Sequence, residues 1–199
     1  MGGGPAGHSG LTGPIVADFR LDTDRLVLRD WREEDVESFQ RICSDPLVMA
    51  TLGPPLDMAA TEALVARQRD RQECLGHCFW AVERRDDGRL IGWCGVIRGT
   101  AGPVTAKAEI GWRLASDCWG HGYATEAAAA TVDWCFASLR DDAVWAITSI
   151  SNHRSRAVME RLGMIYEPEL DFDHPAIPED SPLRTHVTYR LSRKRWPKP

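Results

Sequence analysis

The sequence has few of the features that mark metal sites, membrane proteins or nucleic-acid-binding proteins. None of its six cysteines forms a Cys-x-x-Cys pair, and no spacing of Cys and His fits a zinc site. No apolar run is long enough to span a bilayer. The net charge of −5 argues against nucleic acid as the main partner. We therefore expect no metal, no nucleic acid and no membrane among the ligands of this chain.

The first residues also lack the pattern of a secretory signal. Residues 1–14 are rich in Gly and Pro, with no basic segment followed by an apolar one. We expect residues 1–20 to be a flexible N-terminal segment and residues 21–199 to form one folded domain. Scattered thiols without a leader favour a reducing compartment, and hence a cytoplasmic location.

The remaining composition is that of a globular protein, with 43% hydrophobic and 27% charged residues in 199. Apolar periodicity and turn residues predict seven strands and four helices. The strands are expected at 25–29, 79–83, 90–97, 108–114, 143–150, 164–167 and 185–191. The helices are expected at 33–43, 59–74, from the turn at 120–122 to about 139, and 154–162. This order predicts an α/β (α+β) fold, a mixed and mostly antiparallel twisted sheet with helices on both faces.

The most informative segment is Trp119-Gly120-His121-Gly122-Tyr123-Ala124-Thr125-Glu126-Ala127. Two glycines stand between an expected strand and an alanine-rich helix, where backbone N–H groups and the helix dipole point the same way. Such a site binds anions and suits a pyrophosphate, because glycines without a Cβ let phosphate oxygens approach the backbone. The alternative is a turn that only connects two elements.

An oxidoreductase that binds a dinucleotide is a rival, since Gly120-x-Gly122 resembles part of that fingerprint. Thr125 stands where the third glycine belongs, and the segment is not in a first βαβ unit. We rank this rival low.

Four segments together resemble the GNAT superfamily of acyl-CoA N-acyltransferases, and most closely its branch of ribosomal-protein alanine acetyltransferases. They span nearly everything after about residue 22. The segments are 23–29 with Glu33-Glu34-Asp35, then Ala108-Glu109-Ile110-Gly111-Trp112-Arg113-Leu114, the glycine segment, and Asn152-His153-Arg154-Ser155-Arg156-Ala157 with Leu162-Gly163-Met164. The superfamily's phosphate motif usually begins with Gln or Arg, and Trp119 holds that place here. The resemblance implies that residues 21–199 form an acyl-CoA N-acyltransferase domain.

The resemblance implies acetyl-CoA as co-substrate and a sheet whose central strands, 108–114 and 143–150, splay apart. Pantetheine would enter the gap and pair with backbone of Trp112, Arg113 and Leu114. Amides of the glycine segment would hold the pyrophosphate, and the Asn152 side chain would bond the pantetheine amides. Arg156 would reach the 3′-phosphate, with a surface ion pair as the alternative. The segment residues implied as cofactor-binding are Trp119, Gly120, His121, Gly122, Tyr123, Ala124 and Thr125.

The chemistry requires a base, because an amine near its pKa of about 8 to 10 is largely protonated at neutral pH. Glu109 is the best carboxylate, and the alternative is that an arginine pairs with it. Ser155 is the candidate donor of a proton to the leaving thiolate, and the alternative is a helix residue that bonds nearby backbone. Tyr166 is a weaker acid candidate. A backbone N–H near Trp112 to Leu114 is expected to stabilise the oxyanion.

Trp80, Trp93 and Trp112 are candidate walls of the acceptor cleft, with core packing as the alternative. The acidic loop that contains Asp171 and Asp173 could attract a cationic amine, or it could be solvated surface.

The leading hypothesis is direct acetyl transfer from acetyl-CoA to a primary amine of a protein N-terminus or small molecule. The rival from another class is an acyl-CoA sensor without catalysis. The acceptor, the acyl length and the oligomeric state stay open, a homodimer included.

Overall fold

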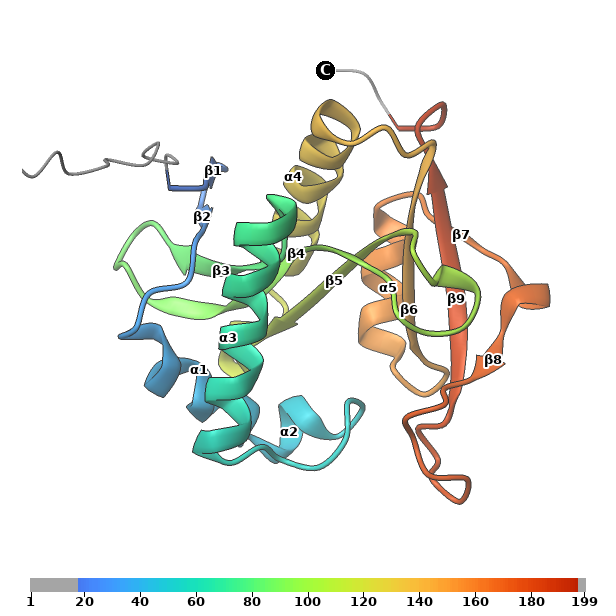
Figure 1. Cartoon of the computed structure of the whole chain (residues 1–199), viewed down its shortest axis with the longest axis horizontal. Helices are drawn as coiled ribbons and strands as arrows, with labels where there is room; N and C mark the ends of the chain where they lie inside the picture. The colour runs from blue at the N-terminus through green and yellow to red at the C-terminus, as the bar shows by residue number, and fades with distance from the viewer. Residues whose placement is uncertain (1–17, 197–199) are drawn as a thin grey trace, which may run out of the picture.

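The computed structural model describes residues 18–196, which form one sheet with helices on both faces (Figure 1). The strands are β1 (Arg20–Asp22), β2 (Leu26–Arg29), β3 (Phe79–Arg84), β4 (Leu90–Arg98), β5 (Ala108–Leu114), β6 (Ala143–Ser149), β7 (Ile165–Tyr166), β8 (Phe172–Asp173) and β9 (Thr185–Ser192). The helices are α1 (Asp35–Cys43), α2 (Pro46–Met49), α3 (Met58–Leu75), α4 (Tyr123–Ser138) and α5 (His153–Arg161), with 3₁₀ turns η1 (Gly102–Val104), η2 (Ser116–Cys118) and η3 (Pro168–Leu170). The predicted fold class is confirmed.

The sheet has the order β1-β2-β3-β4-β5-β6-β9-β7, and β8 pairs with β9. All neighbours are antiparallel except β5 and β6, which are parallel and share one register pair, Glu109 with Trp145. Beyond that pair the two strands separate, and Figure 1 shows them diverging toward the bottom of the view. The middle of the sheet therefore contains a V-shaped gap with Glu109 at its apex.

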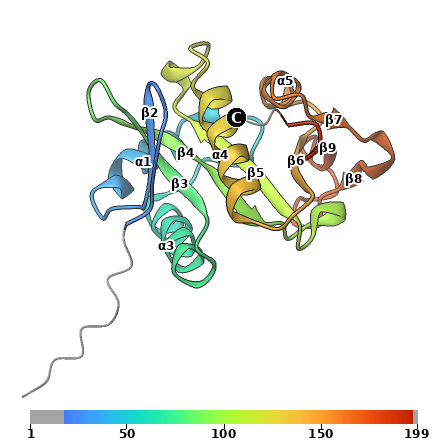
Figure 2. The same ribbon diagram turned by 90° about the horizontal axis from the view of Figure 1, so that it is seen from above.

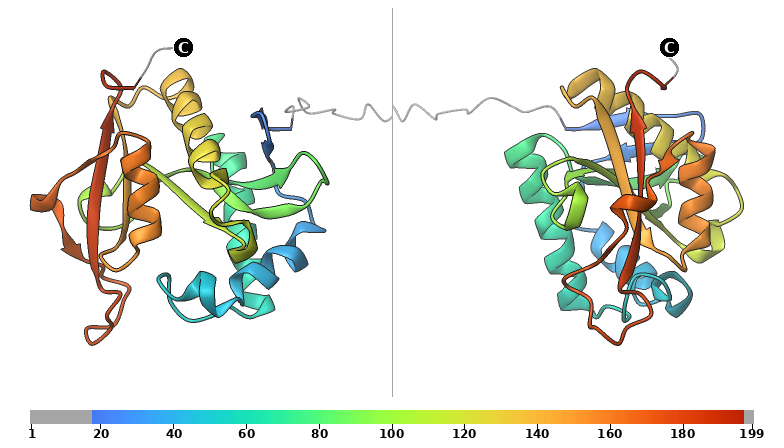
Figure 3. Two further views of the ribbon diagram at one scale, coloured as in Figure 1. Left: turned by 180° about the vertical axis from the view of Figure 1, so that it is seen from behind. Right: turned by 90° about the vertical axis from the view of Figure 1, so that its right-hand side faces the viewer.

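Helices α4 and α5 cover one face of the sheet, and α1 and α3 cover the other, as the views from above (Figure 2) and from behind and the side (Figure 3) show. The buried stripe of α4 follows the helical period and is made of Ala127, Ala128, Thr131, Val132 and Cys135. Its small residues let the helix axis approach the sheet closely, and this fixes the start of α4 beside the open end of the gap.

The folded domain begins earlier than the sequence predicted. Phe19 stacks on Trp80 with ring centroids 4.1 Å apart, and Arg20 opens β1, so residues 19 and 20 belong to the fold. The rest of the expected flexible segment, residues 1–17, lies outside the described residues, as do 197–199.

The longest predicted elements are confirmed, including β5 with the bounds expected. Three short helices or strands were not predicted, because two to four residues carry no periodic signal. They are β1, β8 and α2, and α2 begins where Ser44-Asp45-Pro46 was expected only to end a helix. Asp45 caps it by accepting a hydrogen bond from the Leu47 N–H at 2.8 Å, and Pro46 takes the first helical position.

Within residues 18–196 no helix combines the length and apolarity that a bilayer crossing needs. The same residues contain no group of three His, Cys, Asp or Glu side chains that could hold a metal ion.

Candidate active site

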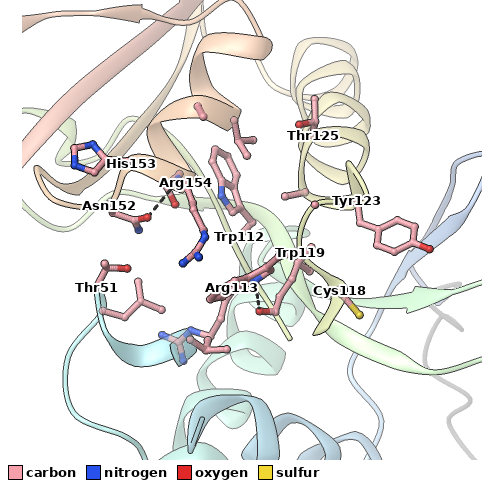
Figure 4. Close-up of a pocket in the computed structure, with 18 of the residues that line it drawn as sticks. Thr51, Trp112, Arg113, Cys118, Trp119, Tyr123, Thr125, Asn152, His153 and Arg154 are labelled. Atoms are coloured by element: carbon pink, nitrogen blue, oxygen red, sulfur yellow. Dashed lines mark hydrogen bonds between the residues drawn. The ribbon is translucent and has the colours of Figure 1, made fainter. Parts of the chain in front are cut away.

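A cavity of about 830 Å³ lies at the open end of the gap (Figure 4). Four segments distant in sequence form its wall: α2 with the loop after it, the end of β5, the glycine segment with the start of α4, and the first turns of α5. The predicted cofactor residues that line it are Trp112, Arg113, Leu114, Trp119, Gly120, Gly122, Tyr123, Ala124, Thr125, Asn152 and Ser155.

The glycine turn has the geometry of an anion site. Gly120 and Gly122 have φ of +80° and +81°, a conformation that favours glycine. Gly122 is the N-cap of α4 and no side chain caps the helix, so the first-turn N–H groups are open toward the pocket. The positive end of the α4 dipole adds to their effect on a negative ligand.

Arg25 holds this turn from outside. Its Nη1 donates to the His121 carbonyl at 2.9 Å, its Nε donates to Glu126 Oε2 at 2.7 Å, and its guanidinium lies 4.7 Å from the Tyr123 ring centroid. The His121 ring stacks on Tyr123 and does not line the cavity, so among the predicted residues His121 contributes backbone only. Residues 23–29 and the glycine segment, two of the four segments that carry the resemblance, are thus bonded together.

The cavity wall is positively charged, although the chain is acidic overall. Arg113, Arg154 and Arg161 line it, and no Asp or Glu does. Arg154 lies with its guanidinium 4.3 Å from the Trp119 ring centroid, over the residue that replaces the usual Gln or Arg of the phosphate motif. The wall suits a ligand with several negative charges.

Asn152 and Ser155 stand at the start of α5. Asn152 is only 8% exposed and caps the helix by accepting a hydrogen bond from the Ser155 N–H at 3.2 Å. Its side-chain NH₂ group is left for another acceptor. The Ser155 hydroxyl makes no hydrogen bond with residues 18–196 and lines the cavity.

Arg156, which the resemblance assigned to the 3′-phosphate, does not line the cavity. Its Nε donates to the Tyr189 hydroxyl at 3.2 Å, and its guanidinium lies 5.6 Å from the Tyr166 ring centroid. A helix turns about 100° per residue, so Arg156 faces β9 while Arg154, Val158 and Arg161 face the cavity.

Glu109 lies at the apex of the gap, on the face that α1 and α3 cover. Arg113, four residues on and therefore on the same face of β5, donates to Cys43 of α1 at 3.1 Å. The Glu109 carboxylate is partly buried and accepts no hydrogen bond from the described residues. Burial raises its pKa from the ordinary 4.5 to about 7, and Arg71 of α3 offsets this only in part. The alternative of an arginine hydrogen-bonded to Glu109 is not observed.

The structure corrects two of the acceptor-site assignments. Trp80 is 0% exposed, and its Nε1 donates to Gln72 at 2.9 Å. Trp93 is 6% exposed and packs between aromatic rings of the α1 side. Both are core residues, as the alternative interpretation held, because each is the large apolar side chain that fills its face of the sheet. Trp112 alone of the three lines the cavity.

Asp171, Asp173 and Tyr166 do not line the cavity. The Tyr166 hydroxyl donates to Asp171 at 2.5 Å, and Asp173 accepts from Thr185 at 3.0 Å and lies 3.3 Å from Arg184. The polar atoms of these three side chains thus bond neighbours in β9 and in the segment that joins β7 to β9.

Two parts of the wall were not found from the sequence. Arg154 and Arg161 share a helical face, which the period of α5 could have revealed. The segment Leu47–Leu52 reaches the cavity only through long-range packing, which no local pattern indicates.

Cys118 also lines the cavity, but it is buried. Burial, followed by the Asp117 charge, raises the pKa of its thiol. A thiol in that state is a poor nucleophile.

Comparison with known proteins agrees with this architecture. Residues 25–165 match the family model described as acetyltransferase (GNAT) domain. The chain is 30% identical over 193 residues to FsC-acetyl coenzyme A-N(2)-transacetylase of Aspergillus fumigatus, covering 92% of this chain and 80% of that protein. Among solved structures, the acetyltransferase from Agrobacterium tumefaciens has a TM-score of 0.73 at 27% identity, covering 92% of this chain and 100% of that one.

A fourth finding concerns the expected branch of ribosomal-protein alanine acetyltransferases. The structure of Mycobacterium smegmatis RimJ in complex with CoA-disulfide has a TM-score of 0.71 at 21% identity, covering 91% of this chain and 89% of that one, and shows a shared fold. The chain belongs to the GNAT acetyltransferase family. It is an N-acetyltransferase, and the expected resemblance to the ribosomal-protein acetyltransferase branch is confirmed at the level of the fold.

Proposed function

We propose that this enzyme moves the acetyl group of acetyl-CoA directly to a primary amine in a ternary complex. Glu109 carries the proposal: it is a carboxylate at the apex of the gap, without a hydrogen-bond partner among the described residues, and its pKa is about 7. Such a group accepts a proton near neutral pH and can pass it on again.

The cavity fits the donor. A CoA thioester carries phosphates and an extended chain of amides. The open first turn of α4 and the three cavity arginines suit the phosphates. The separated edges of β5 and β6 leave backbone groups that can bond amides, and the free NH₂ group of Asn152 adds a donor.

The proposed reaction assigns one task to each side chain. Glu109 takes a proton from the acceptor ammonium, directly or through water, and the freed nitrogen attacks the thioester carbonyl carbon. A backbone N–H between Trp112 and Leu114 stabilises the oxyanion. The C–S bond then breaks, and Ser155 gives its hydroxyl proton to the thiolate and is reprotonated from solvent. The raised pKa of Cys118 supports transfer without a covalent enzyme intermediate.

A thiol-release assay with acetyl-CoA and a panel of amino acids, dipeptides and polyamines tests the activity. Binding of CoA, measured by calorimetry, tests the cavity separately. Gly122→Val should abolish that binding, because a branched side chain blocks the approach of phosphate to the backbone.

The matched control is Gly76→Val. Gly76 also has positive φ, at +72°, ends α3 in open space and is not among the cavity residues, so this variant carries similar backbone strain and should bind CoA normally. Equal affinities for the two variants would refute the donor site. CoA binding without turnover of any amine would make the chain an acyl-CoA sensor instead.

A further inference from the structure

One row of directly paired residues crosses the sheet beside Glu109. The register joins Ile97 to Glu109, Glu109 to Trp145, and Trp145 to Arg190. Directly opposed residues in a sheet point to the same face, so these side chains are neighbours. Whatever amine reaches Glu109 therefore also lies near Trp145 and its surroundings.

Two cationic side chains contact the face of the Trp145 ring. The Lys107 Nζ lies 3.8 Å from its centroid, and the Arg190 guanidinium lies 5.4 Å from it. Lys107 lies just before β5, two residues from Glu109 and so at most about 7 Å from it along the backbone, and its contact with Trp145 places it beside that ring. The charge of Arg71 on α3 also acts on Glu109 and lowers its pKa in part.

These cations lack anionic partners in residues 18–196. No ion pair or side-chain hydrogen bond involves Arg71, Lys107 or Arg190, and the Arg190 Nε is a buried donor with no acceptor. Most arginines elsewhere on β-strands and turns are paired, for example Arg98 with Asp141 at 2.7 Å. A buried donor without an acceptor is costly, which indicates that a ligand supplies the missing acceptor.

The acidic loop does not offset this charge. Asp171 and Asp173 bond Tyr166, Thr185 and Arg184 within their own segment. A polyamine would meet three unpaired cations near Glu109, whereas a zwitterion brings its own carboxylate to them.

We infer that the acceptor is an amine that also carries a carboxylate, such as an amino acid or short peptide with a free C-terminus. Lys107 and Arg190, held on Trp145, bind the carboxylate while the amine faces Glu109. The spacing of about 7 Å matches two residues of extended chain. This inference rests on the proposed function, because it places the amine at Glu109.

Kinetics with glycylglycine and glycylglycinamide test the inference, since the two acceptors differ only in the terminal charge. Per free amine, kcat/KM for the acid should exceed that for the amide at least tenfold. Arg190→Met and Lys107→Met should each raise KM for the acid several-fold and leave the amide and acetyl-CoA unchanged. Arg69→Met, an exposed arginine on α3, is the control and should change neither.

Binding separates this inference from the proposed activity. Calorimetry with CoA present should show N-acetylglycylglycine binding wild-type protein at least tenfold more tightly than its amide. A preference for the acid without any turnover would support the anion site and refute the proposed transfer. Equal binding, no binding of either compound, or better kinetics with spermidine would overturn the inference, even if Arg190→Met fails to fold.

Discussion

Two carboxylate sites of the domain, one around Arg29 and one at Glu109, differ in their hydrogen-bond partners. Asp35 is 4% exposed and bonds Arg29 at 2.7 and 2.8 Å, while Glu83 bonds the same guanidinium at 2.8 Å. Burial alone would lower the pKa of Arg29, but the two carboxylates raise it above its ordinary value. Glu109 has more exposure, no hydrogen bond from the described residues, and a pKa of about 7.

The carboxylates of the first site are engaged by Arg29, whereas the Glu109 carboxylate is left available for chemistry. The carboxylates of Asp35 and Glu83 are bonded to Arg29, and these bonds hold β2, β3 and α1 together. Glu109 has no such bond, and burial raises its pKa to about 7, so its charge changes near neutral pH. Perturbed groups of this kind cluster at functional sites.

Breaking the bonded network around Arg29 should have the largest effect. Asp35→Asn leaves Arg29 with one carboxylate in a buried site and should lower the free energy of unfolding by about 3 kcal/mol, measured by urea denaturation. Asp22→Asn, at the exposed Arg20 pair, is the control and should have little effect. A loss for Asp35→Asn no larger than that of the control would mean that the network is not held as the structure shows.

Removing the Glu109 carboxylate should have its main effect on the rate of acetyl transfer. Glu109→Gln should lower kcat/KM about 100-fold at pH 7, since general-base catalysis is worth about 10² or more. The wild-type rate should rise with pH through about 7 as Glu109 ionises, and the deficit of the variant should shrink at high pH, where free amine is abundant. Parallel pH–rate profiles for the two proteins would remove Glu109 from the mechanism.

The same variant should gain stability in a defined pH window. Because the folded pKa is about 7 and the ordinary value is 4.5, the unfolded chain releases this proton first, so wild-type stability falls as pH rises from 4.5 to 7. Glu109→Gln should therefore match wild type at pH 4 and exceed it at pH 8 by roughly 1–2 kcal/mol, allowing for solvent screening. Thermal melts at both pH values measure this difference. Equal stabilities at pH 8 would mean that Glu109 has an ordinary pKa.

Ser155 should show the smallest effect. Ser155→Ala should slow transfer about tenfold or less, because thiolates are good leaving groups. The loss should be smaller with an acyl donor whose thiol is more acidic, since that group needs less protonation. If both donors lose rate equally, the side chain only positions the donor.

The sequence predicted the parts of this comparison that depend on local pattern. The bounds of β5 placed Glu109 on its strand, and the two glycines indicated the anion site. The environment of Glu109 was not predictable, because its lack of partners depends on α3 and β6, which are distant in sequence. Trp80 and Trp93 were misplaced for the same reason, since which face of a strand becomes core depends on the helices that cover it.

Arg154 and Arg156 show a finer limit on what the sequence predicts about the cavity wall. Both are arginines in one motif, and only the rotation of α5 against β9 separates the one that meets the cavity from the one that bonds Tyr189.

The gap between β5 and β6 also gives this sheet two edges in its interior, in addition to the two at its rims. Exposed strand edges are templates for pairing with other chains and promote aggregation. Here the two inner edges diverge from a single register pair, so a foreign strand that pairs with one of them cannot also pair with the other. The divergence thus keeps open a stretch of unpaired backbone that would be a hazard in a flat sheet.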